Sequence, residues 1–131
     1  MQDIERLFTG AGGRFVSPIA QLAQKLQQVK AFVFDWDGVF NNASKLGGGS
    51  SSFNEVDSMG TNLLRYAYFS KSGHLPLSAV ISGERNETAF YFCKREYFHY
   101  SFFKTPHKTD ALTFICEQHK LLPHEVAYVF D

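Results

Sequence analysis

Two carboxylates that lie one residue apart directly follow a short apolar run. The run 31–34 is expected to be a buried strand, and Asp35, Trp36, Asp37 and Gly38 come next. Burying a carboxylate without a partner is costly, so this pair requires a compensating charge. A divalent cation would supply that charge, with one carboxylate as its ligand and as a nucleophile. A plain turn is the simpler alternative, because Asp and Gly are common turn residues.

Other polar residues follow the later apolar runs in the same way. Ser82 and Gly83 follow the second run, Lys108 comes after the third, and Asp131 follows the fourth. In parallel sheets, ligands bind outside the carboxyl ends of the strands. Carboxylates, a hydroxyl beside a glycine amide, and a lysine suit phosphoryl transfer, because they neutralise and cradle phosphate oxygens. Taken singly, Ser82 is also a typical helix cap and Asp131 a frayed terminal residue.

Along the chain, short apolar runs alternate with segments in which apolar residues recur at helical spacing. We expect strands at about 31–35, 78–82, 97–103 and 126–130, with helices between them. Such alternation requires crossover connections between parallel strands. It therefore predicts an α/β fold, a three-layer sandwich with a parallel, Rossmann-like sheet.

Cap and turn residues predict where the helices begin and end. The expected caps are Ser17 followed by Pro18, Asp57 or Ser58, and Thr105 followed by Pro106, with Gly73 as a helix stop. A cap at Thr105 places Lys108 in the first helical turn, where a cation opposes the helix dipole and a bound phosphate would explain it. Residues 39–55 are interpreted as a hairpin-like flap with a flexible Gly/Ser tip.

Composition limits the classes of function. The chain has 131 residues, 44% of them hydrophobic, and equal numbers of acidic and basic residues, which fits one domain without nucleic-acid or anionic-membrane partners. No apolar stretch reaches membrane-spanning length, and the N-terminus lacks the pattern of a signal peptide. Cys93 and Cys116 form no Cys-x-x-Cys pair, and we interpret them as reduced thiols of a cytoplasmic protein.

In this order, the motifs resemble those of the haloacid dehalogenase-like (HAD) phosphatases. The four matching segments are 34–39, 81–83, Lys108 with 111–112, and 127–131. The resemblance implies a HAD-like phosphatase core at 29–131, preceded by an N-terminal helical extension at 1–28. The flap and the segment 53–60 resemble the capless subgroup, which includes the deoxy-octulosonate phosphate phosphatases.

The resemblance implies a Mg²⁺-dependent phosphomonoester hydrolase that acts through an aspartyl-phosphate. Asp35 would attack phosphorus, and Asp37 would act as general acid and then general base while its carbonyl binds Mg²⁺. Lys108 would pair with Asp35 and the phosphate. Asp131 would join Asp35 in binding the metal.

The same resemblance implies a set of substrate-binding residues and a mode of assembly. Trp36, Ser82, Gly83 and Arg85 would contact the substrate or its phosphate. The substrate would be a small sugar-acid phosphate, and the assembly a homo-oligomer, a tetramer in which one subunit's flap completes its neighbour's pocket. A mobile surface hairpin on a monomer is the alternative.

The chain also departs from the family pattern. It reaches only the first Asp of the fourth motif, which indicates a truncated or degenerate member without the last strand and helix. Glu84 follows Gly83 where the sugar-phosphate enzymes tend to carry Arg, and Ser58 stands where Gly is expected. Two alternatives therefore stay open: a non-catalytic sugar-phosphate-binding subunit of an oligomer, and a receiver-type phosphoacceptor domain. The absence of an Asp at the end of the third strand argues against the second.

Overall fold

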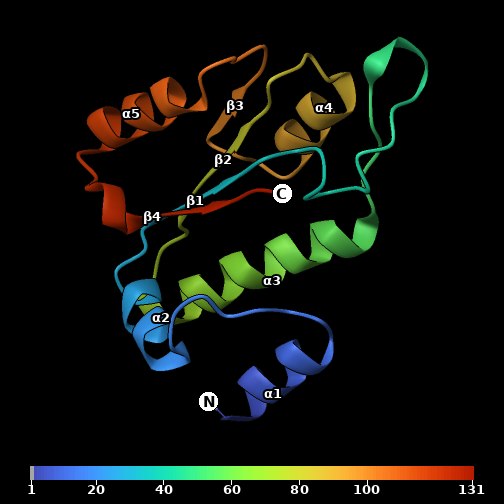
Figure 1. Cartoon of the computed structure of the whole chain (residues 1–131). Coiled ribbons are helices and arrows are strands. Elements are labelled where there is room, and N and C mark those ends of the chain that lie inside the picture. The colour runs from blue at the N-terminus through green and yellow to red at the C-terminus, as the bar shows by residue number, and fades with distance from the viewer. Residues whose placement is uncertain (1) are drawn as a thin grey trace.

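The computed structural model describes residues 2–131, which form a four-stranded parallel sheet with helices on both faces (Figure 1). The strands are β1 (Ala31–Phe34), β2 (Leu77–Ile81), β3 (Tyr100–Phe102) and β4 (Val126–Val129). Their order in the sheet is β3-β2-β1-β4. The predicted α/β sandwich with one parallel sheet is confirmed.

Strand β1 lies inside the sheet and sets the register of its neighbours. Ala31 pairs with Leu77 of β2 on one side and with Val126 of β4 on the other, both in parallel. All residues of β1 and β2 are buried, as expected for strands covered on both faces. The carboxyl ends of all four strands therefore reach one edge of the sheet.

The third strand is shorter than predicted. We expected a strand over 97–103, but β3 covers only Tyr100–Phe102. The reason is local: Tyr97 has a φ of 54°, in the left-handed region, and the Phe98 N–H donates back to the carbonyl of Cys93. The chain is still turning out of the preceding helix at the point where we expected a strand.

Helices cover the sheet on both sides. Helices α3 (Glu55–Ser72) and α4 (Glu87–Arg95) pack on the face that carries Phe32 and Phe34, and α5 (Lys108–His119) packs on the opposite face. Figure 1 shows α3 and α5 on opposite sides of the sheet. Helices α1 (Gln2–Gly10) and α2 (Ile19–Leu26) precede β1, and 3₁₀ turns occupy Gly47–Gly49 and Pro123–Glu125. No helix of the described residues is both long and apolar enough to cross a membrane.

The predicted helix stop at Gly73 is confirmed, but the predicted N-caps are wrong. Gly73 has a φ of 76° and its N–H donates to Phe69. The observed N-caps are Pro18 for α2, Asn54 for α3, Asn86 for α4 and His107 for α5. Thr105 does not cap α5 because its hydroxyl donates to the Phe103 carbonyl. The carbonyls of Pro18 and Asn54 already accept helical N–H groups, which starts those helices at the observed residues.

The flap forms a closed loop whose arms do not pair as strands. The Leu46 N–H donates to the Ser50 carbonyl at 2.7 Å, and the Asn54 N–H donates to Phe40 at 3.4 Å. The Gly47–Gly49 turn lies between the first two of these residues. The flap is therefore closed by backbone hydrogen bonds at its tip and at its base.

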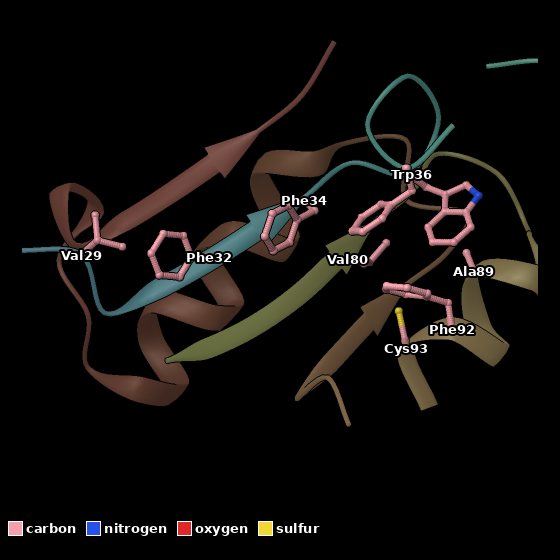
Figure 2. Close-up of a cluster of buried hydrophobic side chains, with 9 residues drawn as sticks. Val29, Phe32, Phe34, Trp36, Val80, Ala89, Phe92 and Cys93 are labelled. Atoms are coloured by element: carbon pink, nitrogen blue, oxygen red, sulfur yellow. The ribbon is translucent and has the colours of Figure 1, made fainter. Parts of the chain in front are cut away.

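The core beneath the flap is largely aromatic. Figure 2 shows Phe32 and Phe34 along β1, with Trp36 beyond the end of the strand, near Ala89 and Phe92 of α4. Trp36 stacks on Phe40 with ring centroids 5.1 Å apart, and Phe92 contacts both rings. The core on the other face is mostly aliphatic, built from residues of β1, β2 and α5. The aromatic cluster therefore supports the loop that carries the predicted catalytic carboxylates.

Candidate active site

Asp35 and Lys108 meet at the carboxyl end of the sheet. Asp35 directly follows β1 and is 7% exposed, and Lys108 is the first residue of α5. The Lys108 ammonium donates to Oδ2 of Asp35, while the Trp36 N–H donates to Oδ1 at 2.8 Å. The buried carboxylate thus has the cationic partner that the sequence required. The fold joins two residues that lie 73 positions apart.

The environment of Lys108 keeps its amine charged. Burial lowers the pKa of Lys108, but the hydrogen bond and charge of Asp35 outweigh that effect and leave the pKa raised. Tyr128 of β4 also raises the pKa of Lys108. Lys108 is therefore available as a permanent positive charge beside Asp35.

Asp37 is held by two residues of the flap. The Ser51 hydroxyl donates to Oδ1 of Asp37 at 2.5 Å, and the Lys45 ammonium binds Oδ2. Lys45 also reaches Glu84 at 3.3 Å, in the loop after β2. The hydrogen bond to Asp37, followed by that to Glu84, raises the pKa of Lys45 against the opposing effect of burial.

Asp131 lies directly against the loop that carries Asp35 and Asp37. A methyl group added to Gly38 would lie 2.5 Å from Oδ2 of Asp131 and 2.6 Å from its Cβ. Only a residue without a side chain leaves room for this approach, and Gly38 also has a φ of 76°. The structure therefore brings Asp131 to the first motif, as predicted from the order of the strands.

Ser82 lies at the end of β2, on the same edge. It is 2% exposed, and its N–H donates to the Phe102 carbonyl at 2.8 Å. The Ser82 hydroxyl accepts a long hydrogen bond, 3.4 Å, from the N–H of Glu84. Gly83 is exposed, with open space around its α-carbon.

Two predicted binding residues do not present their side chains as expected. The Trp36 side chain is fully buried in the aromatic cluster, and its backbone N–H already binds Asp35. Arg85 is an exposed residue whose guanidinium pairs with Glu87 at 2.6 Å. The Trp36 ring packs into the core, and a contact between Trp36 and a substrate or its phosphate stays a prediction. Arg85 has a carboxylate partner of its own.

Four residues at or beside this site were not predicted from the sequence. Lys45 and Ser51 of the flap bind Asp37, Asn86 binds Ser51, and the Tyr128 hydroxyl is buried near Lys108. Burial raises the pKa of Tyr128, and its oxygen has no hydrogen-bond partner within residues 2–131. Only Asn86 carried a signal: an Asn two residues before a Thr at a helix start is a typical N-cap.

Oxygen atoms of the kind that hard cations bind lie along this edge. The carboxylates of Asp35 and Asp131 and the carbonyl of Asp37 are the donor type that Mg²⁺ prefers. Within the described part of the chain, no group of three or more His, Cys, Asp or Glu side chains converges as a metal cluster.

Comparison with known proteins gives matches among solved structures alone. No protein-family model and no curated protein matches the chain. Among solved structures, a 3-deoxy-D-manno-octulosonate 8-phosphate (KDO 8-phosphate) phosphatase from Moraxella catarrhalis, in complex with magnesium, phosphate and KDO, is similar at 19% identity and a TM-score of 0.74. That match covers 87% of this chain and 64% of the other.

Two other structures match in the same way. A putative HAD-superfamily (subfamily III A) hydrolase from Legionella pneumophila has 22% identity and a TM-score of 0.72, over 86% of this chain and 60% of the other. A probable YrbI-family phosphatase from Pseudomonas syringae pv. phaseolica has 25% identity and a TM-score of 0.71, over 83% and 60%. The chain thus spans between 60% and 64% of the length of these structures. The protein has the HAD fold of these phosphatases, as its motifs predicted.

Proposed function

We propose that this protein is a Mg²⁺-dependent phosphomonoester hydrolase that acts through an aspartyl-phosphate on Asp35. One observation carries the proposal: a buried carboxylate bonded to a lysine at the carboxyl end of a parallel sheet, with a second carboxylate two residues later. Phosphoryl transfer needs a nucleophile, positive charge around the phosphate and a proton donor for the leaving oxygen. Asp35, Lys108 and Asp37 have the chemistry for these three roles.

The proposed reaction has two displacements at phosphorus. In the first, an Asp35 oxygen bonds to phosphorus, the bond to the ester oxygen breaks, and Asp37 gives that oxygen a proton. In the second, water bonds to phosphorus as Asp37 takes up its proton, and the bond to Asp35 breaks. Inorganic phosphate and the alcohol are the products, and both aspartates return to their starting states.

Other residues of the edge would hold the phosphate and the metal. Lys108 and the Ser82 hydroxyl would bind phosphate oxygens, and the open backbone at Gly83 would allow close approach. Asp35, the Asp37 carbonyl and Asp131 would hold Mg²⁺, and their hard oxygen donors fit that ion. The cation would supply charge neutralisation at the transferring phosphoryl group.

We further propose that the substrate is a small sugar-acid phosphate and that the chain acts as a homo-oligomer in the cytoplasm. The similar Moraxella structure holds KDO and phosphate, which supports the substrate class. Apolar side chains of the flap and of the outer side of α3 are exposed, which supports contact with a second subunit; they are Leu46, Val56, Met59, Leu63 and Tyr66. The division into an extension at 1–28 and a core at 29–131 also stays a prediction.

A non-catalytic sugar-phosphate binder is the second candidate. Both carboxylate oxygens of Asp37 are engaged, one by Ser51 and one by Lys45. If Lys45 stayed in place, Asp37 would have no free oxygen for proton transfer.

Phosphate release from p-nitrophenyl phosphate, with and without Mg²⁺, separates the two candidates. A hydrolase releases phosphate only with the metal present, and Asp35→Asn stops the release. Metal-dependent binding of inorganic phosphate without any turnover would instead favour the binder.

A further inference from the structure

Ser51 carries a fully buried hydroxyl in the flap, next to the exposed Ser52. It is 0% exposed, and its hydroxyl contacts four side chains, those of Trp36, Asp37, Asn86 and, at 3.4 Å, Asn41. The Trp36 indole Nε1 lies 3.0 Å from its oxygen, and the Asn86 amide nitrogen lies 2.8 Å away. The fully buried Ser51 thus connects the first motif, the flap and the start of α4.

Three nitrogens contact the Ser51 oxygen, and all three donate; the third is the Asn41 amide at 3.4 Å, whose Oδ1 accepts the Ala43 N–H. An indole N–H has no acceptor capacity. The Asn86 side chain is fixed in orientation, because its Oδ1 accepts the N–H groups of Thr88 and Ala89, each at 3.1 Å. Its NH₂ group must therefore face Ser51. The two nearer donors, from Trp36 and Asn86, occupy the two lone pairs of the Ser51 oxygen.

The Ser51 hydrogen then has one destination. It is donated to Oδ1 of Asp37, which makes Oδ1 an acceptor. When Asp37 is protonated, its proton must sit on the other oxygen, Oδ2. In this structure Oδ2 binds Lys45, a partly exposed lysine whose second partner is Glu84 at 3.3 Å.

We propose that Ser51 is a positioning residue that assigns Oδ2 of Asp37 as the oxygen that transfers the proton. This inference rests on the proposed function. Lys45 moves from Asp37 to Glu84 when substrate enters, which frees Oδ2. The Oδ2 proton then passes to the ester oxygen as the phosphorus–oxygen bond breaks, and the attacking water later returns a proton to Oδ2.

The test compares two leaving groups in the Ser51→Ala variant. p-Nitrophenoxide leaves without protonation, whereas phenoxide is a poorer leaving group and depends more on an acid. We expect kcat/KM to fall about tenfold or more for phenyl phosphate and much less for p-nitrophenyl phosphate, since general acid catalysis is worth about 10²–10⁴-fold. Ser51→Thr keeps the hydroxyl and should restore most of the phenyl phosphate activity.

A purely structural role predicts a different pattern. An equal loss for both substrates, or a Thr variant as impaired as the Ala variant, would overturn the proposal. Ser52→Ala is the matched control, because Ser52 is the exposed neighbour and contributes its backbone carbonyl to the Asn41 amide. This control should leave both substrates unaffected.

A second readout needs no activity and separates this inference from the proposed function. Urea unfolding, followed by Trp36 fluorescence, is measured for Ser51→Ala, Asp37→Asn and the double variant. A double variant that loses less stability than the two single variants together supports the contact. Strict additivity would overturn the inference even in an active enzyme. An inactive parent chain with coupled residues would instead reject the proposed function and retain the Ser51–Asp37 contact.

Discussion

The flap side and the β4 side of the candidate site are built in different ways. On the flap side, buried hydrogen bonds fix Asp37 through Ser51, Trp36 and Asn86. On the β4 side, exposed Asp131 contacts the first motif by packing against Gly38. Hydrogen bonds thus position Asp37 on the flap side. On the β4 side, Asp131 can approach because Gly38 has no side chain.

The same contrast extends into the sheet and its core. Strands β1 and β2 are buried throughout, whereas β3 is half-buried and β4 becomes exposed at Val129. The aromatic cluster with Phe92 supports the flap side. We therefore expect substitutions at the candidate residues that follow β1 to have large effects. Substitutions near β4 should have smaller, local effects.

The largest effect is expected at Asp35, the proposed nucleophile. Asp35→Asn should reduce phosphatase turnover by more than about 10³-fold, because an amide neither attacks phosphorus nor binds Mg²⁺ as a charge. Phosphate release with millimolar Mg²⁺ measures it. Asp110→Asn, an exposed change in the first turn of α5, serves as the control and should stay active. A comparable loss in both variants would contradict the assignment of Asp35.

The next largest effect compares a buried ring of the aromatic cluster with a partly exposed ring on the other face of the sheet. Phe92→Ala removes a fully buried ring and should cost about 3–5 kcal/mol of unfolding free energy. Phe114→Ala removes a ring that is 42% exposed on α5 and should cost less than half as much. Urea unfolding of both variants measures the difference. Equal costs would contradict the burial of Phe92 in the aromatic cluster.

Gly38 tests the β4 side against a matched glycine. Gly38→Ala and Gly73→Ala both place a methyl group at a φ of 76°, which costs about 1–2 kcal/mol in the left-handed region. Only at Gly38 does the methyl group meet Asp131; at Gly73 nothing lies within 4 Å. We expect a larger loss of stability at Gly38, together with weaker Mg²⁺ binding in titration calorimetry.

The two glycine variants can also disprove the packing of Asp131 on Gly38. Identical unfolding free energies and unchanged Mg²⁺ affinity in both would show that Asp131 does not pack on Gly38 in solution.

The smallest effect concerns Glu96, which joins α3 to α4 below the flap. Burial raises the pKa of Glu96, but hydrogen bonds from Asn62, Arg95 and Ser58 outweigh it and lower the pKa. A lowered folded-state pKa contributes stability above the unfolded value of 4.5, and this contribution is lost as the pH falls through the folded value. Glu96→Gln should therefore be less stable than the parent at pH 7, and the difference should shrink below pH 4.5.

Unfolding midpoints of the parent and Glu96→Gln, measured from pH 7 downward, test this sign. A difference that stays constant or grows on acidification would contradict it.

The part of the site that follows strand order could be predicted from the sequence. The apolar runs fixed the ends of the strands, so Asp35, Lys108 and Asp131 were expected to meet at one edge. Lys108 and Asp35 do so although most of the chain separates them. The parallel sheet follows from the same alternation.

The parts that depend on side-chain direction and distant partners could not be predicted in this way. Ser51 lies in a Gly/Ser-rich tip, and nothing local indicates that Trp36 and Asn86 meet there. The burial of the Trp36 ring did have a signal in the sequence: Phe32, Phe34 and Trp36 alternate, and all three lie in the aromatic cluster. The short β3 reflects the left-handed Tyr97, a conformation that non-Gly side chains seldom adopt.

The most direct test of the central claim is to identify the residue that carries phosphate during turnover. The protein is mixed with p-nitrophenyl phosphate and Mg²⁺, quenched in acid and reduced with borohydride, which converts an aspartyl-phosphate into homoserine. Mass spectrometry of the peptide that contains residues 31–45 locates the change. We predict homoserine at position 35 and not at position 37. Turnover that leaves Asp35 unmodified, or modifies a different residue, would contradict the account.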